Sequence, residues 1–270
     1  GSGTFNPNNA TEGTYTFTYS FAAVGGCAAD NATVTVEVTE QKEAGNSADA
    51  ILTCNTNDTD IPLFLGLTGA DIGGTWTAGG SNPSGGTFNA GSGTFNPNNA
   101  TEGTYTFTYS FAAVGGCVAD NATVTVEVTD QKEAGTAEPA LAVCSTNNTP
   151  IDLSTLLSGE DTGGTWTAGG SNPSGGTFNA GSGTFNPNNA TEGTYTFTYS
   201  FAAVGGCAAD NATVTVEVTE QKEAGNSADA ILTCNTNDTD IPLFLGLTGA
   251  DIGGTWTAGG SNPSGGTFNA

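Results

Sequence analysis

The sequence contains no histidine, no methionine and no arginine, and its only basic side chains are three lysines. Against them stand 27 acidic residues, which gives a formal net charge of −24. Nucleic-acid phosphates are held by Lys and Arg, so this composition excludes nucleic acid as the main partner and also disfavours an anionic membrane surface. The missing histidine removes the commonest general base and metal ligand.

Long apolar segments are missing as well. The sequence contains no signal peptide and no run long enough to span a membrane, so we expect no membrane insertion in this stretch. Charged residues make up only 11% of the chain and hydrophobic residues 36%. This balance is typical of folded domains and not of a disordered acidic tail.

The sequence repeats with a period of 90 residues. Residues 1–90 and 181–270 are identical, and the copy between them, 91–180, differs mainly in the segment 136–162. A unit of this length exceeds the 20–50 residues of solenoid repeats and matches a small domain with its own core. The chain therefore carries two alternating versions of one domain.

The domain boundaries follow from the lysines. Lys42, Lys132 and Lys222 each lie in the polar segment Glu/Asp-Gln-Lys-Glu-Ala-Gly, which separates two patterned regions. Cutting there predicts two whole domains and, at the two ends, complementary halves of the same domain. The four parts are 1–43 (C-terminal half), 44–133 (first version), 134–223 (second version) and 224–270 (N-terminal half).

Strict alternation predicts β-strands. Residues 104–111 read Thr-Tyr-Thr-Phe-Thr-Tyr-Ser-Phe, and residues 122–128 alternate in the same way with valines on one side. No segment shows a helical period. About seven short strands per domain favour an all-β fold of tandem immunoglobulin-like antiparallel β-sandwiches, arranged like beads on a string. We expect the core to contain Trp76, Trp166, Tyr105, Phe107, Tyr109 and Phe111.

The order of motifs resembles a known family. A Cys and a Leu-rich segment precede Gly-Gly-Thr-Trp-Thr, Gly-Thr-Phe-Asn-Pro, Gly-Thr-Tyr-Thr-Phe-Thr-Tyr, Gly-Gly-Cys and Asn-Ala-Thr-Val-Thr-Val. This order is similar to the tandem immunoglobulin-like repeats of very large secreted surface adhesins of Bacteroidetes, with the flavobacterial gliding-motility adhesin as the nearest type. The resemblance implies export by the type IX system, anchoring at the cell surface and adhesion.

Six cysteines, two per domain and without histidine, favour disulfides over zinc and hence an extracellular location. Loop-closure entropy barely separates the two pairings that we considered. A bond inside a small, glycine-rich domain would compensate for its thin core, which favours Cys54–Cys117, Cys144–Cys207 and Cys234 with Cys27 of the next copy. The rival pairing, Cys27–Cys54 and its repeats, would join neighbouring domains, and buried free thiols are a third alternative.

Two candidate sites have a plainer structural alternative. Asn55, Asn57, Asp58 and Asp60 form an oxygen-rich run that could hold calcium. The second version has no acid at this place, which favours a solvated turn, so no cofactor is required. Trp76 and Trp166 could stack on sugars, although a single Trp in a sandwich usually belongs to the core. Acid pairs such as Glu160–Asp161 have no companion base or nucleophile, so we expect no enzyme.

Two functions remain. The domains form a stiff stalk or filament, or they bind glycans or surfaces themselves. The near-identical copies favour the first, whereas the difference between 46–72 and 136–162 would fit a ligand face. The halves 1–43 and 224–270 complete each other, which predicts head-to-tail self-assembly, by covalent continuation or by strand complementation between chains.

Overall fold

The computed structural model describes residues 1–263 and 265–269, and the chain divides into two compact units. The first unit comprises Gly1–Glu133 together with Phe201–Asp210, and the second comprises Ala134–Ser200 together with Asn211–Ala270. Both are built from β-strands. The helical elements in the described part of the chain are single 3₁₀ turns, η1 (Leu63–Gly66), η2 (Leu153–Leu156) and η3 (Leu243–Gly246). The all-β prediction is confirmed.

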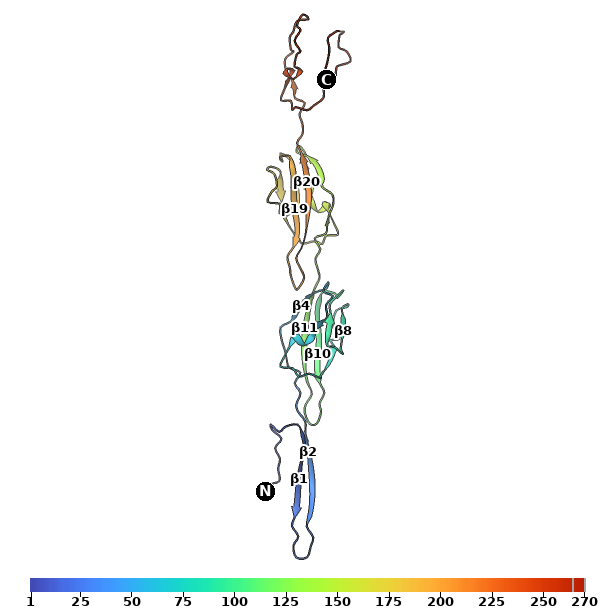
Figure 1. Cartoon of the computed structure of the whole chain (residues 1–270), viewed down its shortest axis with the longest axis vertical. Coiled ribbons are helices and arrows are strands. Elements are labelled where there is room, and N and C mark those ends of the chain that lie inside the picture. The colour runs from blue at the N-terminus through green and yellow to red at the C-terminus, as the bar shows by residue number, and fades with distance from the viewer. Residues whose placement is uncertain (264, 270) are drawn as a thin grey trace. The chain divides into compact units, whose positions relative to one another are not determined.

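The first unit contains a complete sandwich. One sheet has the order β4 (Ile51–Cys54), β11 (Asp120–Thr129), β10 (Gly103–Phe111) and β7 (Thr75–Ala78). The other has the order β5 (Ile61–Pro62), β9 (Thr94–Asn96) and β8 (Thr87–Asn89), and a small pair is formed by β3 (Asn46–Ser47) and β6 (Leu67–Thr68). Figure 1 shows β10 and β11 adjacent in this sandwich.

The core lies where the alternation places it. Tyr105, Phe107 and Tyr109 are only 2%, 1% and 1% exposed, while the threonines between them face outward. Valines of β11 pack against the same cluster, Phe111 is partly buried at its edge, and the Trp76 ring lies 4.8 Å from that of Tyr109. The buried Tyr105 hydroxyl donates to the Ser84 carbonyl, at 2.6 Å, so the apolar interior keeps no unpaired hydroxyl there.

The order of strands fixes the position of Cys54. β4 runs parallel to β11, with Cys54 opposite Thr129 at the C-terminal end of β11. β10 and β11 form a long antiparallel hairpin whose turn lies beyond Phe111 and Asp120, at the other end of β11. Cys54 therefore lies at the C-terminal end of β11, whereas the β10–β11 turn, which contains Cys117, lies at its N-terminal end.

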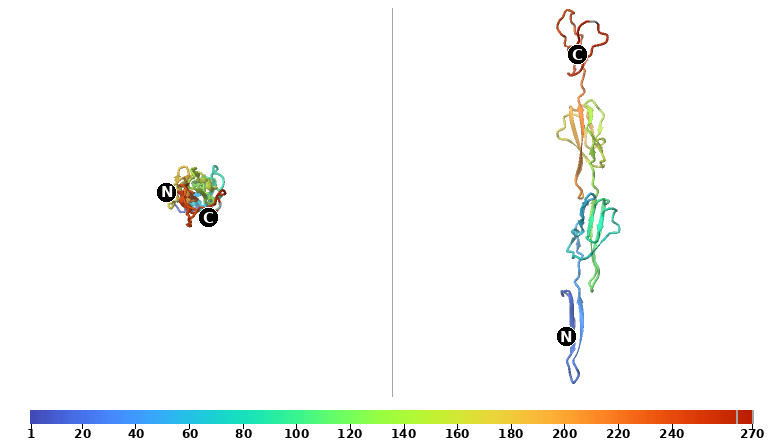
Figure 2. Two further views of the ribbon diagram at one scale, coloured as in Figure 1. Left: turned by 90° about the horizontal axis from the view of Figure 1, so that it is seen from above. Right: turned by 45° about the vertical axis from the view of Figure 1, so that its right-hand side comes forward.

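The N-terminal hairpin consists of β1 (Gly13–Phe21) and β2 (Asp30–Val38). β1 has the same sequence as β10, yet Phe17, Tyr19 and Phe21 are 42%, 67% and 63% exposed. Figures 1 and 2 show the N-terminal residues running back beside this hairpin. The centre of the Phe5 ring lies 5.0 Å from the ring centres of Tyr15 and Phe17. Burial of the aromatic face thus depends on the strands that the rest of a domain supplies.

The second unit repeats the sandwich. Its main sheet has the order β13 (Leu141–Cys144), β20 (Asp210–Thr219), β19 (Gly193–Phe201) and β16 (Thr165–Ala168). The opposite sheet has the order β14 (Ile151–Asp152), β18 (Thr184–Asn186) and β17 (Thr177–Asn179). Small pairs are formed by β12 (Thr136–Ala137) with β15 (Leu157–Ser158), and by β21 (Asn226–Ser227) with β22 (Leu247–Thr248).

One grouping differs from the predicted boundaries. The end of the β19–β20 hairpin, Phe201–Asp210, belongs to the first unit, although the sequence pattern placed it inside a domain spanning 134–223. The reason is that this hairpin end is bonded to β4 through the Cys54–Cys207 disulfide and accepts a hydrogen bond from Gln131. Within residues 1–263 and 265–269, no helix has the length and apolar character needed to cross a bilayer.

Candidate cross-link site at Cys54

The hairpin end in the first unit carries a tight turn, Val204-Gly205-Gly206-Cys207. The Cys207 N–H donates to the Val204 carbonyl at 2.8 Å, and Val204 N–H to the Cys207 carbonyl at 3.3 Å. Gly205 and Gly206 have φ of +57° and +87°. A two-residue hairpin turn with both central residues at positive φ suits the twist of the strands, and glycine adopts it without strain. The Gly-Gly-Cys motif therefore projects a cysteine at the tip of the hairpin.

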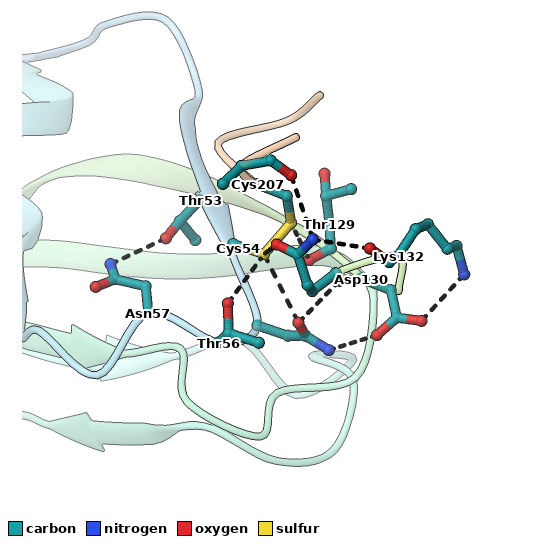
Figure 3. The surroundings of a disulfide bond; sticks show 11 residues. Thr53, Cys54, Thr56, Asn57, Thr129, Asp130, Lys132 and Cys207 are labelled. Atoms are coloured by element: carbon teal, nitrogen blue, oxygen red, sulfur yellow. Dashed lines mark hydrogen bonds and ion pairs between the residues drawn. A yellow bond between two sulfur atoms is a disulfide. The ribbon is translucent and has the colours of Figure 1, made fainter. Parts of the chain in front are cut away.

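The tip meets the end of β4 and β11. Cys54 and Cys207 form a disulfide with a Cα–Cα distance of 4.6 Å (Figure 3). Cys54 is 4% and Cys207 5% exposed, so the bond is shielded from solvent. The Cys207 sulfur lies 3.3 Å from the Thr129 carbonyl oxygen.

The turn approaches the receiving strand too closely for any side chain. A Cβ added at Gly206 would lie 2.8 Å from the Thr53 Cα and 3.0 Å from its amide nitrogen. A Cβ at Gly205 would lie 2.7 Å from the Thr129 Cβ. Thr53 is 4% exposed and belongs to β4, so it has no free space to withdraw. Both glycines are therefore required by contact as well as by φ.

The linker closes around the tip through polar groups. The Gln131 side-chain amide donates to the Ala208 carbonyl at 3.2 Å and to the Lys132 carbonyl at 2.9 Å. The Asn55 amide donates to the Asp130 carboxylate, and the Gln131 N–H returns a 3.0 Å bond to the Asn55 side-chain oxygen. Lys132 pairs with Asp130 at 3.2 Å. The polar segment predicted as a boundary is thus ordered against β4.

This bond corrects the predicted pairings. The predicted Cys54–Cys117 bond is wrong. Cys54 lies beside Thr129, and Cys117 lies 12 residues before Thr129, near the opposite end of the extended strand β11. At about 3.3 Å per residue the separation is roughly 40 Å, whereas a disulfide needs Cα atoms within about 7 Å. Cys144–Cys207 is wrong for the same reason, since Cys144 pairs with Thr219. The rival Cys27–Cys54 bond is also wrong, because Cys54 is bonded to Cys207. The predicted bond between Cys234 and Cys27 of the next copy stays a prediction, and both cysteines are free thiols in this chain.

The same docking is present a second time in the first unit. The turn Val114-Gly115-Gly116-Cys117 has φ of +56° and +90° at its glycines. The Cys117 thiol donates to the Thr39 carbonyl at 3.4 Å, and the Gln41 amide donates to the Val118 carbonyl at 3.1 Å. Each contact matches one made by Cys207 and Gln131. Cys117 is nevertheless a free thiol, as are Cys27, Cys144 and Cys234.

The oxygen-rich run does not converge. The Asn57 amide donates to the Thr53 hydroxyl at 3.2 Å, while Asp60 accepts from the Asn96 amide at 3.1 Å and Asp58 from the Asn98 amide at 3.2 Å. The Asn55 amide is engaged with Asp130. In the described part of the chain, no three His, Cys, Asp or Glu side chains are grouped to hold a metal. The solvated turn stays the prediction for these residues, with calcium binding as its alternative.

Sequence reasoning missed one hollow in the second unit. Phe64 covers the tryptophan of the first version, with its ring 6.0 Å from that of Trp76 and 5.0 Å from that of Tyr109. The second version has Ser154 there, and Trp166 is half-buried where Trp76 is buried. A hollow of 330 Å³ opens beside Trp166 and Tyr199, with Glu160 and Asp161 at its wall. The signal in the sequence was the Phe64/Ser154 difference.

Comparisons with known proteins add little. No protein-family model matches the chain, and no curated protein matches its sequence. Among solved structures it is similar to an I-band fragment of titin, with 11% identity and a TM-score of 0.42 over 78% of this chain and 75% of that one. It is similar to an N-cadherin fragment from Drosophila (13%, TM-score 0.34, 70% of this chain and 52% of that one).

A third similar structure is a SusE-like surface-located polysaccharide-binding protein from Bacteroides thetaiotaomicron, with 12% identity and a TM-score of 0.27. The match covers 70% of this chain and 36% of that one. With TM-scores this low, the fold of the chain rests on its own strands, which form immunoglobulin-like sandwiches in tandem.

Proposed function

We propose that the chain is a structural stalk or filament segment of an extracellular bacterial surface protein, in which disulfides at hairpin tips cross-link successive immunoglobulin-like repeats. The observation that carries this proposal is the buried Cys54–Cys207 bond, with its fitted Gly205-Gly206 turn. Disulfides persist in oxidising surroundings, which supports a location outside the cytoplasm. The bacterial source and the cell surface come from the sequence resemblance alone.

The cross-link suits a structural role energetically. It closes a loop with a sequence separation of 153 residues. The chain-entropy relation gives about 5 kcal/mol of stabilisation for a loop of that length, at the upper end of what disulfides contribute. A repeat array fixed in this way resists unfolding without a large apolar core.

Peptide mapping tests the proposal directly. A protease that cleaves before Asp separates all six cysteines into different fragments, with Cys54 in 49–57, Cys117 in 71–119 and Cys207 in 161–209. Digestion of the secreted, unreduced protein should recover 49–57 joined to 161–209. Recovery of 49–57 joined to 71–119, or of all cysteines as free thiols, would contradict the structural role proposed for the cross-link.

A second candidate function is glycan binding by the second version of the domain. The hollow beside Trp166 supports it, because Phe64 shows that a six-membered ring fits the equivalent place edge-on to the indole. An aromatic wall with a few polar groups at its rim is the usual make-up of a small-ligand site. A sugar ring would lie against Trp166, and Glu160 would accept its hydroxyl hydrogens.

Ser154→Phe provides the test, since it restores the residue of the first version. Indole fluorescence of the full chain should change on titration with an oligosaccharide panel, and Ser154→Phe should abolish the change. An unchanged response in Ser154→Phe would show that the signal comes from elsewhere, and no response in the unaltered chain would remove this candidate.

A further inference from the structure

Cys144 lies in a setting that matches that of Cys54. β13 runs parallel to β20 with Cys144 opposite Thr219, as β4 runs parallel to β11 with Cys54 opposite Thr129. The Ser145 N–H donates to the Thr219 carbonyl at 2.9 Å, and the Asn147 N–H to the Cys144 carbonyl at 3.0 Å. The equivalent bonds at Cys54 measure 3.0 and 3.1 Å. The backbone that receives a hairpin tip is thus already formed at Cys144.

The polar groups that hold the tip are also in place. The Gln221 amide donates to the Lys222 carbonyl at 3.1 Å, just as Gln131 donates to Lys132 at 2.9 Å. In the docked sites this same amide donates its other hydrogen to the residue after the tip cysteine. The Gln221 N–H donates to the Ser145 hydroxyl at 3.3 Å, replacing the bond between Gln131 and Asn55. Gln221 therefore needs no rearrangement to receive a tip.

The place that the tip would fill is open. A hollow of 370 Å³ beside Cys144 is lined by Ala142, Val143 and the segment 219–222. At Cys54 the equivalent residues are Leu52 and Thr53, and Gly206 of the docked turn lies against them. The turn meets the backbone of these residues, and the Leu52 side chain is 57% exposed, so the change to Ala142 leaves the contact surface for the tip intact. Cys144 is half-buried, whereas Cys54 is buried.

We propose that Cys144 and this hollow form a receptor for the Val-Gly-Gly-Cys hairpin tip of another copy of the repeat, closed by a disulfide. The inference rests on the proposed structural function and extends it to the second version of the domain. The occupant is identified by fit: only a turn with glycine at both central positions approaches the strand as Gly205 and Gly206 approach Thr129 and Thr53.

The bond forms by thiol–disulfide exchange. A small-molecule or protein disulfide acts as the oxidant: one cysteine displaces a thiol from it, and the second cysteine displaces the other thiol. Two protons and two electrons pass to the oxidant, and one S–S bond joins the repeats. A hydrogen bond from the Thr146 hydroxyl lowers the pKa of the Cys144 thiol, which raises its thiolate fraction.

This chain supplies a donor for the test. Cys27 is exposed at the tip Val24-Gly25-Gly26-Cys27, whose glycines have φ of +56° and +89°. The full chain carrying Cys117→Ser and Cys234→Ser would retain the Cys54–Cys207 bond, Cys27 as donor and Cys144 as receptor. Equal amounts of ¹⁴N- and ¹⁵N-labelled chain are mixed in a glutathione redox buffer and digested before Asp without reduction.

The expected product joins fragment 1–29 to fragment 130–151 in mixed-isotope form, which proves a bond between copies. Gly26→Ala should lower its yield at least fivefold, because the added methyl meets the receiving strand. A control chain with Cys144→Ser and Thr167→Cys, an exposed strand position, should link to Cys27 at least tenfold less. Equal linkage of that control, or insensitivity to Gly26→Ala, would overturn the receptor.

The same digest separates the two proposals. Recovery of 49–57 joined to 161–209 without any Cys144 product would refute the receptor and leave the structural function intact. Loss of the 49–57 product as well would refute both.

Discussion

Gly206→Ala should weaken the Cys54–Cys207 cross-link more than its backbone strain alone explains. At φ of +87°, alanine costs about 1–2 kcal/mol. The new Cβ would also lie 2.8 and 3.0 Å from the Thr53 backbone, which is buried and paired with β11. Forcing a methyl group into a filled site costs about 1–3 kcal/mol. That second contribution alone should lower the effective concentration of the two thiols roughly 5- to 150-fold.

Gly116→Ala is the matched control. Gly116 occupies the same position in an identical turn, at φ of +90°, but an added Cβ meets nothing within 4 Å. It places the same substitution in an identical turn that takes no part in the Cys54–Cys207 bond, so it controls for effects on the rest of the chain. Each variant is equilibrated in glutathione buffers of graded redox potential, and the fraction of Cys54–Cys207 bond is measured by alkylation and mass spectrometry. Equal redox midpoints for Gly206→Ala and Gly116→Ala would refute the argument that the turn is fitted against Thr53.

Three further predictions concern single groups. Phe107→Ala should lower the free energy of unfolding by about 3–5 kcal/mol in urea denaturation, because Phe107 is 1% exposed, and Phe17→Ala, 42% exposed, should cost less than half as much. Equal costs would contradict the exposed face of β1. Because the Thr146 hydroxyl stabilises the Cys144 thiolate, Thr146→Val should move the pH midpoint of Cys144 alkylation upward; a downward shift would refute the hydrogen bond as cause. Calcium should leave the Tm unchanged, since Asn96 and Asn98 already donate to the Asp60 and Asp58 carboxylates, and a rise in Tm with calcium would instead support an ion site.

The strands were predictable because their signal is local. Alternation over nine or ten residues sets both the extended backbone and the buried side in β10 and β11, so Phe107 could be placed in the core directly. The disulfide was not predictable in this way. It depends on the parallel register of β4, a strand of four residues, which decides that Cys54 lies beside Thr129. No periodicity in so short a strand reveals its partner or its direction.

The hollow beside Trp166 had a readable but ambiguous signal. The change from Phe64 to Ser154 is plain in the repeats, yet its meaning depends on knowing that Phe64 lies over Trp76. Only the packed structure shows which side chain covers the indole. For the same reason the close contact of Gly206 with Thr53 could not be predicted from the sequence.

The bond between Cys54 and Cys207 also decides which part of the chain bears tension. When the chain is pulled before Cys54 and after Cys207, the tension passes through the two sulfur atoms, so the 152 residues between them bear none of it. Fully extended, that loop would add roughly 500 Å of contour length. The oxidised chain cannot gain this length even when both sandwiches unfold, whereas a reduced chain gains it once they unfold. Extensibility under force therefore depends on the redox state of one bond as well as on the stability of each domain.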